Sequence, residues 1–235
     1  MTGKETVLVI SDLQAPFHHK DAIPFLQAVA DKYNPTQIVC IGDEVDFHAL
    51  SDYDHDPDGW SAGQELKQAL KFMHKLYEAF PVVKVCISNH TSRPLRRAKK
   101  YGIPKAFMKD YHEFLEAPPG WQWKDLWYID GVRYEHGDGI GGGGAETAAR
   151  RAVNKRRESV VVGHFHAGAG VQWSRTKKDM IFGMNVGSLV DHHAYAFAYW
   201  KGGSTETIGC GIVERGVPTF VPMPQKKGGR WTKSL

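Results

Sequence analysis

The first half of the chain alternates short apolar, β-branched runs with longer amphipathic segments. The runs 6–10, 37–41 and 81–87 are predicted as buried strands. Segments 21–32 and 61–80 carry apolar residues at helical spacing and are predicted as helices. The first strand, helix and strand form a βαβ unit, which predicts that the first two strands are parallel, because the helix returns the chain to the same edge. The order continues as strand, helix, strand.

The second half is richer in strand patterns. The basic segment 93–109 is predicted to be helical with breaks at Gly102 and Pro104, and 145–157 is predicted as a second basic helix. An aromatic stretch at 121–128 and the run 132–135 are predicted to form a β-hairpin. Antiparallel strands are expected from this hairpin on. A further strand is predicted at 159–162, and antiparallel strands are predicted at 171–173, 180–185, 194–200 and 208–213. We expect one α/β domain with two packed sheets over 1–222, followed by a basic C-terminal tail at 223–235.

Composition narrows the class of protein. The 235 residues carry 30 basic and 26 acidic side chains, and this net charge of +4 is too weak to indicate nucleic-acid binding by itself. No stretch approaches the roughly 18–20 consecutive apolar residues of a membrane span, and the polar N-terminus predicts no signal peptide. Three widely spaced cysteines favour reduced, buried thiols. We therefore expect a cytoplasmic protein without a membrane partner. Its small, compact build is typical of a bacterial or phage protein, so we expect it in a bacterial cell or a phage-infected host cell.

Polar residues follow five of the predicted strands at the point where each strand ends. An acidic residue in such a place is often only part of a turn. Burying several carboxylates and imidazoles together, however, is unfavourable unless cations compensate them. Because strand ends of an open α/β sheet meet in one crevice, the set predicts a metal centre. Its members are Asp12, Asp43, Asn89, His90, His136, His164 and His166.

These residues carry a resemblance to a known family. The calcineurin-like metallophosphoesterases have five signatures, which read D-x-H, G-D-x-x-D, G-N-H-D/E, H with a small residue after it, and G-H-x-H. The chain has similar motifs in the same order: Asp12-Leu13-Gln14, Gly42-Asp43-Glu44-Val45-Asp46, Ser88-Asn89-His90, His136-Gly137 and Gly163-His164-Phe165-His166. Asn185-Val186-Gly187-Ser188 resembles the N-P-G-S turn that follows them in many members.

The resemblance implies an α/β fold, a four-layer α/β/β/α sandwich of two mixed sheets, and two divalent metal ions. It implies that Asp12, Asp43 and His166 bind the first ion, with Gln14 at the position of a family histidine. Asp43 would bridge to the second ion, which Asn89, His136 and His164 complete. His90 would be the catalytic histidine, oriented by Asp46. Mixed nitrogen and oxygen donors favour Mn²⁺, with Fe, Zn, Ni or Mg as alternatives.

Two departures from the family bear on the site. An amide oxygen at Gln14 is a poorer ligand than imidazole for Zn²⁺ or Ni²⁺ and is better suited to Mn²⁺ or Mg²⁺. Thr91 replaces the acidic residue after the Asn-His pair, and Ser88 replaces a glycine. The supporting role of that acid is therefore missing from its usual position.

The implied activity is hydrolysis of phosphate esters by metal-activated hydroxide, with a phosphorylated small molecule or a nucleic acid as substrate. Basic and aromatic surroundings favour phosphodiesters or nucleotides. A phosphomonoesterase or protein phosphatase is the alternative enzyme, although Phe47 stands where family phosphatases carry arginine. A non-catalytic, metal-stabilised binding scaffold is the third interpretation. Arg93 is a candidate phosphate ligand or a charge on a helix surface, and exposed aromatic residues are compatible with a homodimer.

Overall fold

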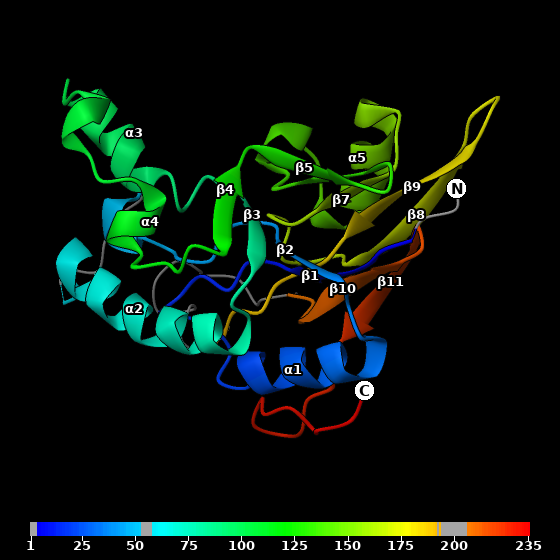
Figure 1. Ribbon diagram of the computed structural model, residues 1–235, viewed down its shortest axis with the longest axis horizontal. Coiled ribbons are helices and arrows are strands. Elements are labelled where there is room, and N and C mark those ends of the chain that lie inside the picture. Colours follow the sequence, from blue (N-terminus) through cyan, green and yellow to red (C-terminus); the bar gives the residue numbers. More distant parts are fainter. Residues whose placement is uncertain (1–3, 53–57, 192, 194–205) are drawn as a thin grey trace.

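Two β-sheets lie face to face, and helices cover their outer faces (Figure 1). The computed structural model describes residues 4–52, 58–191, 193 and 206–235. The strand predicted at 194–200 lies outside the described residues. No helix in the described part of the chain is long and apolar enough to cross a membrane.

The first sheet has six strands in the order β11-β10-β1-β2-β3-β4. Its parallel strands are β1 (Thr6–Ile10), β2 (Gln37–Cys40), β3 (Val83–Cys86) and β4 (Trp121–Lys124), and its antiparallel edge is β10 (Gly209–Glu214) and β11 (Val217–Pro222). Helices α1 (Ala22–Tyr33) and α2 (Ala62–Ala79) pack on its outer face. α2 begins where its sequence predicts, because Ser61 and Gln64 form a reciprocal capping box.

The second sheet has five strands in the order β5-β6-β7-β9-β8. They are β5 (Leu126–Ile129), β6 (Val132–Glu135), β7 (Val160–Val162), β9 (Met180–Asn185) and β8 (Gly170–Arg175), and α5 (Ala148–Arg156) covers their outer face. Gly183 allows that helix to lie close, because a Cβ there would come within 2.0 Å of the Ala149 carbonyl oxygen.

Alternate residues of the central strands face two different cores. Val7 and Val9 of β1 pack between the sheets, together with Tyr134 of β6 and Phe182 of β9. Leu8, next to them in β1, faces the helices α1 and α2. A period of two residues therefore explains why the strands are apolar on both faces. The expected α/β class, with two mixed sheets between helical layers, is confirmed.

The connection between the sheets differs from the prediction. The predicted hairpin is present, but only from Leu126 on, where β5 pairs antiparallel with β6 in the second sheet. The first half of the stretch 121–128 forms β4, which pairs with β3 in the first sheet. The expectation of antiparallel strands after this point is confirmed where β8 pairs with β9 and where β10 pairs with β1. It is wrong for the neighbours β6, β7 and β9, which run parallel to one another. Both halves of the stretch have the alternation of a strand, so the sequence pattern alone does not show that the chain changes sheets at Asp125.

Short helical segments fill the connections. The basic segment 93–109 forms α3 (Arg93–Lys100) and the turn η2 (Lys105–Phe107), with α4 (Tyr111–Phe114) after it. The other 3-10 turns are η1 (His48–Leu50), η3 (Asp138–Ile140) and η4 (Ala145–Thr147).

Residues 223–235, expected as a basic tail, pack against the start of α1. The Trp231 ring is only 8% exposed and meets the Phe25 ring edge-on at 5.6 Å between centroids. Arg230 Nε donates to Asp21 Oδ2 at 2.7 Å, and the Trp231 backbone N–H donates to the same oxygen at 2.9 Å. Asp21 thus holds the C-terminal segment instead of capping α1 with its side chain.

Candidate metal centre

The predicted site residues lie at strand ends that share one edge of the sandwich. β1, β2 and β3 are parallel neighbours in the first sheet, and β6 and β7 are parallel neighbours in the second. Their carboxyl ends carry Asp12, Asp43, Asn89 with His90, His136, and His164 with His166, respectively. The structure brings these side chains into two adjoining groups.

Three of these residues have a left-handed backbone, which side chains other than glycine rarely adopt. The φ angles are +46° at Asp12, +50° at Asp43 and +66° at His164. The neighbouring turns are tight as well, because a Cβ at Gly163 would come within 2.6 Å of Asp12 Oδ2. Such strained turns persist where the surrounding structure enforces them, and they cluster at functional sites. Here they aim the side chains at one point instead of along the strands.

The first group consists of Asp12, Gln14 and His166. Nε2 of His166 lies 3.3 Å from Asp12 Oδ1 and 3.1 Å from Gln14 Nε2. Asp12 Oδ1 and Gln14 Oε1 are both buried, and neither accepts a hydrogen bond from any described residue. A buried oxygen without a donor is unfavourable by about 1–3 kcal/mol, so this group fits a cation placed among its atoms.

The second group consists of Asp43, Asn89, His136 and His164. His136 Nε2 lies 2.6 Å from Asn89 Oδ1 and 3.3 Å from Asp43 Oδ2. One donor atom each from Asp43, His136 and His164 falls within a 4.8 Å span. On the other side of the ring, Nδ1 of His136 lies 3.0 Å from the Ile41 carbonyl oxygen and donates to it. That hydrogen bond leaves Nε2 facing Asp43 and Asn89, an arrangement in which a histidine can bind a metal ion.

The charges of the two groups are tightly coupled. Burial lowers the pKa of His136, but the Asp43 carboxylate outweighs it and raises that pKa to about 9. Burial likewise lowers the pKa of His166, while Asp12 and Glu206 raise it to about 10. Burial raises the pKa of Asp43, yet the neighbouring histidines hold it well below its usual range. Asp43 and His136 thus stabilise each other's charged forms.

His90 lies at the mouth of the second group and is held by a buried carboxylate. Its Nδ1 hydrogen-bonds to Asp46 Oδ1, and its Nε2 lies 3.9 Å from Asp43 Oδ2. Arg93 is not a surface charge: its side chain is 7% exposed and Nη1 donates to Asp46 Oδ1 at 3.1 Å. Nη2 of Arg93 lies 3.2 Å from His90 Nε2. An arginine only donates, so Nε2 accepts, and the ring carries its proton on Nδ1.

A buried network behind the site supplies a carboxylate from an unexpected position. Glu44 is fully buried, and Oε2 accepts a hydrogen bond from the Thr91 hydroxyl at 2.9 Å. Oε1 accepts from Trp123 Nε1 at 2.9 Å. The Ser88 hydroxyl donates to Thr91 Oγ1 at 3.1 Å and accepts from the Asp43 backbone N–H at 2.8 Å. Glu44 thus supports the turn at Asp43 through Thr91 and Ser88, the two residues that differ from the G-N-H-D/E signature.

Sequence reasoning missed Glu44 and Glu206. Glu44 stands at an unspecified position of the motif around Asp43, and only its burial reveals a role. Glu206 Oε1 lies 3.6 Å from His166 Nδ1, on the side of the ring away from Asp12. No feature of the sequence near 206 signals this contact, since it depends on the pairing of Glu206 with Ala167 across the fold.

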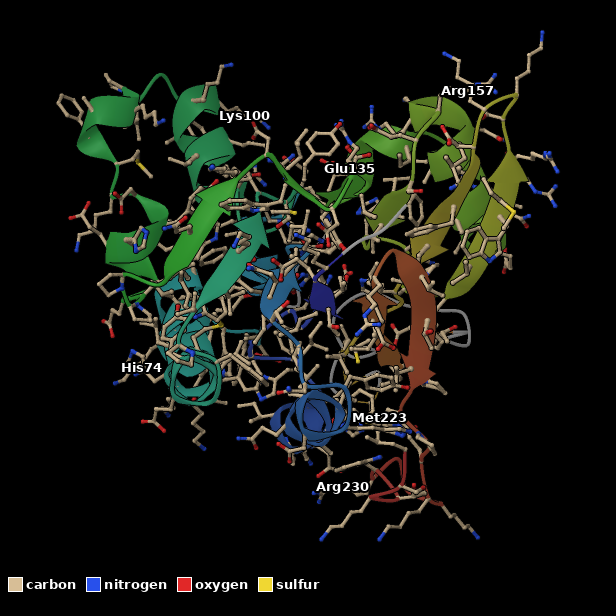
Figure 2. The ribbon with its side chains drawn as sticks, turned by 45° about the vertical axis from the view of Figure 1, so that its right-hand side comes forward. His74, Lys100, Glu135, Arg157, Met223 and Arg230 are labelled. Carbon is tan, nitrogen blue, oxygen red and sulfur yellow. The ribbon has the colours of Figure 1, made fainter. Side chains whose placement is uncertain are left out.

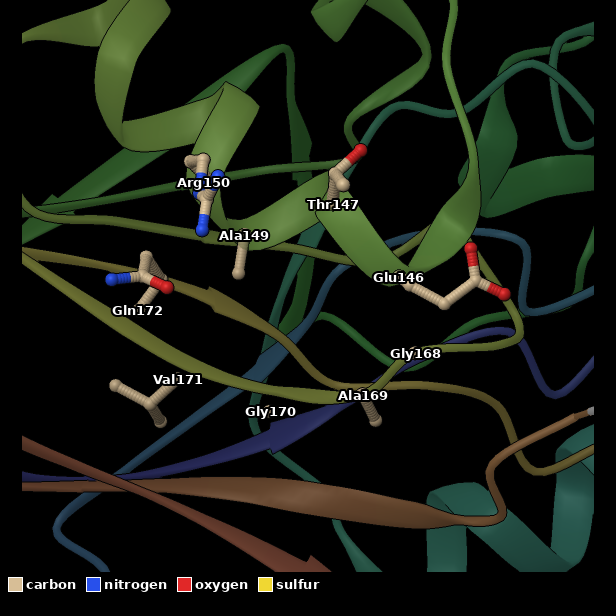
Figure 3. A pocket seen from close by; sticks show the side chains of 9 residues that line it. All are labelled: Glu146, Thr147, Ala149, Arg150, Gly168, Ala169, Gly170, Val171 and Gln172. Atoms are coloured by element: carbon tan, nitrogen blue, oxygen red, sulfur yellow. The ribbon is translucent and has the colours of Figure 1, made fainter.

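Two surface pockets lie outside these groups. One, of about 210 Å³, opens between the start of α5 and β8 and is lined in part by Glu146, Arg150 and Gln172 (Figure 3). The other, of about 470 Å³, lies along α3 and the turn after it, between Leu95 and Met108.

Comparisons with known proteins find similarity among solved structures at low sequence identity. No protein-family model matches it, and no curated protein matches it. Solved structures do match. Vacuolar protein sorting 29 from Cryptosporidium parvum is 12% identical with a TM-score of 0.45, over 90% of this chain and 85% of that one. YfcE, a phosphoesterase from E. coli, is 16% identical with a TM-score of 0.40, over 89% and 88%. A metallophosphoesterase from Sphaerobacter thermophilus is 15% identical with a TM-score of 0.43, over 91% and 84%. The similarity is one of fold.

Proposed function

We propose that the chain is a dinuclear-metal-dependent phosphoesterase. The observation that carries this proposal is the meeting of donor atoms from five strand ends, among which buried oxygens of Asp12 and Gln14 have no hydrogen-bond donor in the described chain. Asp12, Gln14 and His166 would hold one divalent cation. Asn89, His136 and His164 would hold the other, and Asp43 would serve both.

The donors are carboxylate, amide and imidazole groups, which suit Mn²⁺ and also accommodate Fe, Zn, Ni or Mg. A bound pair of cations supplies an activated water and neutralises the charge of phosphate oxygens. The protein supplies the shape of the site. The His136 hydrogen bond to Ile41 fixes one ligand atom, and Glu44 fixes the turn of Asp43.

His90 and Arg93 act on the substrate in this proposal. Asp46 holds the proton on Nδ1 of His90, so Nε2 faces the site as an acceptor. Arg93 covers that nitrogen at 3.2 Å and is buried, which makes its guanidinium a ready donor to a phosphate oxygen. When Arg93 turns to the phosphate, Nε2 becomes free to take up a proton from solvent and to deliver it to the leaving ester oxygen.

We favour phosphodiesters or nucleotides as substrates, because a cation and an aromatic ring adjoin the site. Arg96 donates to the Asn89 carbonyl oxygen at 2.7 Å, and the Phe165 ring meets the His164 ring edge-on at 5.1 Å between centroids. A phosphomonoesterase, a protein phosphatase and a non-catalytic scaffold remain the alternatives. The buried cysteines at 40, 86 and 210 suit a reducing compartment, so we propose that the protein acts in the cytoplasm of a bacterium or a phage-infected cell. We also propose a homodimer that forms through exposed aromatic residues.

The test compares bis-p-nitrophenyl phosphate with p-nitrophenyl phosphate, with added Mn²⁺ and after EDTA treatment. We expect Mn²⁺-dependent turnover that is faster on the diester. His90→Ala should retain the metals and lower turnover by about 10²–10⁴-fold, the range for an acid–base group. Bound metal without turnover of either ester would establish the scaffold instead, and faster turnover of the monoester would establish the phosphomonoesterase.

A further inference from the structure

The segment 93–109 projects from the body of the molecule as a cationic arm. It carries seven basic side chains and no acidic one: Arg93, Arg96, Arg97, Lys99, Lys100, Lys105 and Lys109. It comprises α3 and the turn η2, which lie at one end of the molecule (Figure 1). The net charge of the whole chain is only +4, so this arm concentrates positive charge that the rest of the chain balances.

Part of this charge is already used within the fold. Arg93 reaches His90, and Arg96 donates to the carbonyl oxygen of Asn89 at 2.7 Å. Arg97 and Lys100 lie 2.8 Å and 3.4 Å from the carboxylate of Asp52. These contacts attach the root of the arm to the metal centre and to the loop beside it.

Three lysines farther along have no carboxylate within ion-pair distance in the described ranges: Lys99, Lys105 and Lys109. Apolar side chains are exposed between them, with Tyr101 74% exposed and Phe107 79% exposed. Aromatic rings are usually largely buried in a folded protein, so two exposed rings among lysines without ion pairs indicate a surface that binds a partner.

The 470 Å³ groove lies on this same arm. Its floor includes Leu95, Ala98 and Ile103, and both Lys99 and Lys105 line it. A pocket of this size falls within the range of small-ligand sites, and here it is apolar inside with ammonium groups beside it. That combination suits a flat, uncharged ring attached to an anion.

We propose that the cationic arm binds a single strand of nucleic acid, with phosphates on its lysines and bases against Tyr101, Phe107 and the groove. This inference rests on the proposed function and names its substrate class. Unpaired bases offer faces for stacking, whereas a duplex keeps them covered, so open rings favour a single strand. α3 begins at Arg93 beside His90, so a nucleic-acid strand that lies along this helix extends towards the candidate metal centre.

Binding is measured by fluorescence anisotropy with a labelled 20-mer of deoxythymidine in EDTA, so that cleavage does not interfere. The test variant is the triple K99A/K105A/K109A. The matched control is the triple K226A/K227A/K233A, which removes the same charge from the C-terminal segment. Figure 2 shows Lys100 and Arg230, which mark the two segments, at opposite ends of the molecule.

We expect the arm triple to weaken binding by about 100-fold at 0.1 M salt, because each lost phosphate contact lowers the salt slope by about 0.7. The two curves should converge near 1 M salt. Tyr101→Ala and Phe107→Ala should each weaken binding by roughly 10-fold, as loss of a stacking ring does. The control triple should change the affinity by less than about 3-fold.

Equal weakening by the two triples would overturn the proposal, because binding would then follow net charge alone. A 20-residue polyglutamate that binds the arm as tightly as the oligonucleotide would also overturn it, in favour of an acidic protein partner. Turnover of bis-p-nitrophenyl phosphate in Mn²⁺ should be the same in the wild type and the control triple. If the wild type has no turnover, the proposed function fails, while the binding result in EDTA still decides the role of the arm.

Discussion

Asp46 contacts both His90 and Arg93, and replacing it by asparagine removes the negative charge from both contacts. The side chain of Asp46 is fully buried and that of Arg93 is 7% exposed, so water compensates little of the loss. An amide that turns its NH₂ towards His90 donates to Nδ1 and moves the ring proton to Nε2. That nitrogen then meets the donor Nη2 of Arg93, which lies 3.2 Å away in the wild type.

The expected effects follow from this geometry. Breaking a buried ion pair typically destabilises a protein by about 3–5 kcal/mol. We expect the lower end, about 3 kcal/mol, because the Asp46 backbone oxygen still accepts from Arg93 Nη1 at 2.8 Å. For a chain of this size, that corresponds to a fall in Tm of about 6–12 °C. Turnover should fall by about 10²–10⁴-fold, because His90 presents the wrong tautomer.

The assay is Mn²⁺-dependent hydrolysis of bis-p-nitrophenyl phosphate, with metal content and Tm measured on the same samples. Asp52→Asn is the matched control, since it makes the same chemical change at an exposed ion pair with Arg97. It should leave turnover unchanged. Metal content should stay at the wild-type level in both variants. Wild-type turnover in Asp46→Asn would show that Asp46 does not set the tautomer of His90. Loss of its metals would show that Asp46 supports the ligands instead.

Three further predictions concern the ligands and the network behind them. Gln14→His should shift the preferred metal from Mn²⁺ towards Zn²⁺ or Ni²⁺, as measured by elemental analysis after exposure to an equimolar mixture. Metal uptake should release protons and strengthen as the pH rises towards 9, because Asp43 raises the pKa of His136 to about 9 and a ligand nitrogen has to be neutral. Calorimetry in buffers of different ionisation enthalpy measures that release. Thr91→Val should destabilise the protein by about 1–3 kcal/mol, because buried Glu44 loses a donor, and the measurement is Tm.

Each of these predictions has a contradicting result. An unchanged metal profile in Gln14→His would mean that this amide does not contact a metal. Uptake that releases no protons between pH 6 and 8 would show that His136 is not a ligand. Thr232→Val, at an exposed hydroxyl, is the control for Thr91→Val. Equal Tm values for the two variants would remove Glu44 from the support of the site.

Local patterns in the sequence predicted the elements that are both apolar and bounded by clear signals. Strand β1 is apolar on both faces, and α2 has an amphipathic face together with its Ser61 cap. The candidate site could be assembled from sequence because its residues follow strands directly. Parallel neighbours end at one edge, so the order of the first three strands was enough to place Asp12, Asp43 and Asn89 together. His136 and His164 follow strands of the second sheet, and only the resemblance to the family motifs joined them to this set.

The failures arise where tertiary pairing decides the structure. The two halves of 121–128 have the same alternation, and nothing local distinguishes a strand of the first sheet from one of the second. The segment 223–235 has the composition of a tail, but Trp231 packs on Phe25 and Arg230 reaches Asp21. A tryptophan among lysines and glycines was the signal in the sequence that this segment is anchored.

The role of Glu44 lies beyond motif reasoning for a related reason. Its carboxylate is useful only because Thr91 and Trp123, which are distant in sequence, close around it. Residue type and spacing describe which groups follow a strand, whereas hydrogen bonds across the core depend on how the strands stack. Such contacts require coordinates.

Donor atoms from five strand ends are proposed to hold a pair of divalent cations, and equilibrium dialysis against Mn²⁺ followed by elemental analysis counts those ions. We expect two ions per chain in the wild type and a loss of both in Asp43→Asn, because that carboxylate would serve both positions. A wild-type chain that retains no metal, or an Asp43→Asn variant that retains as much as the wild type, would show that these strand ends do not hold a pair of cations.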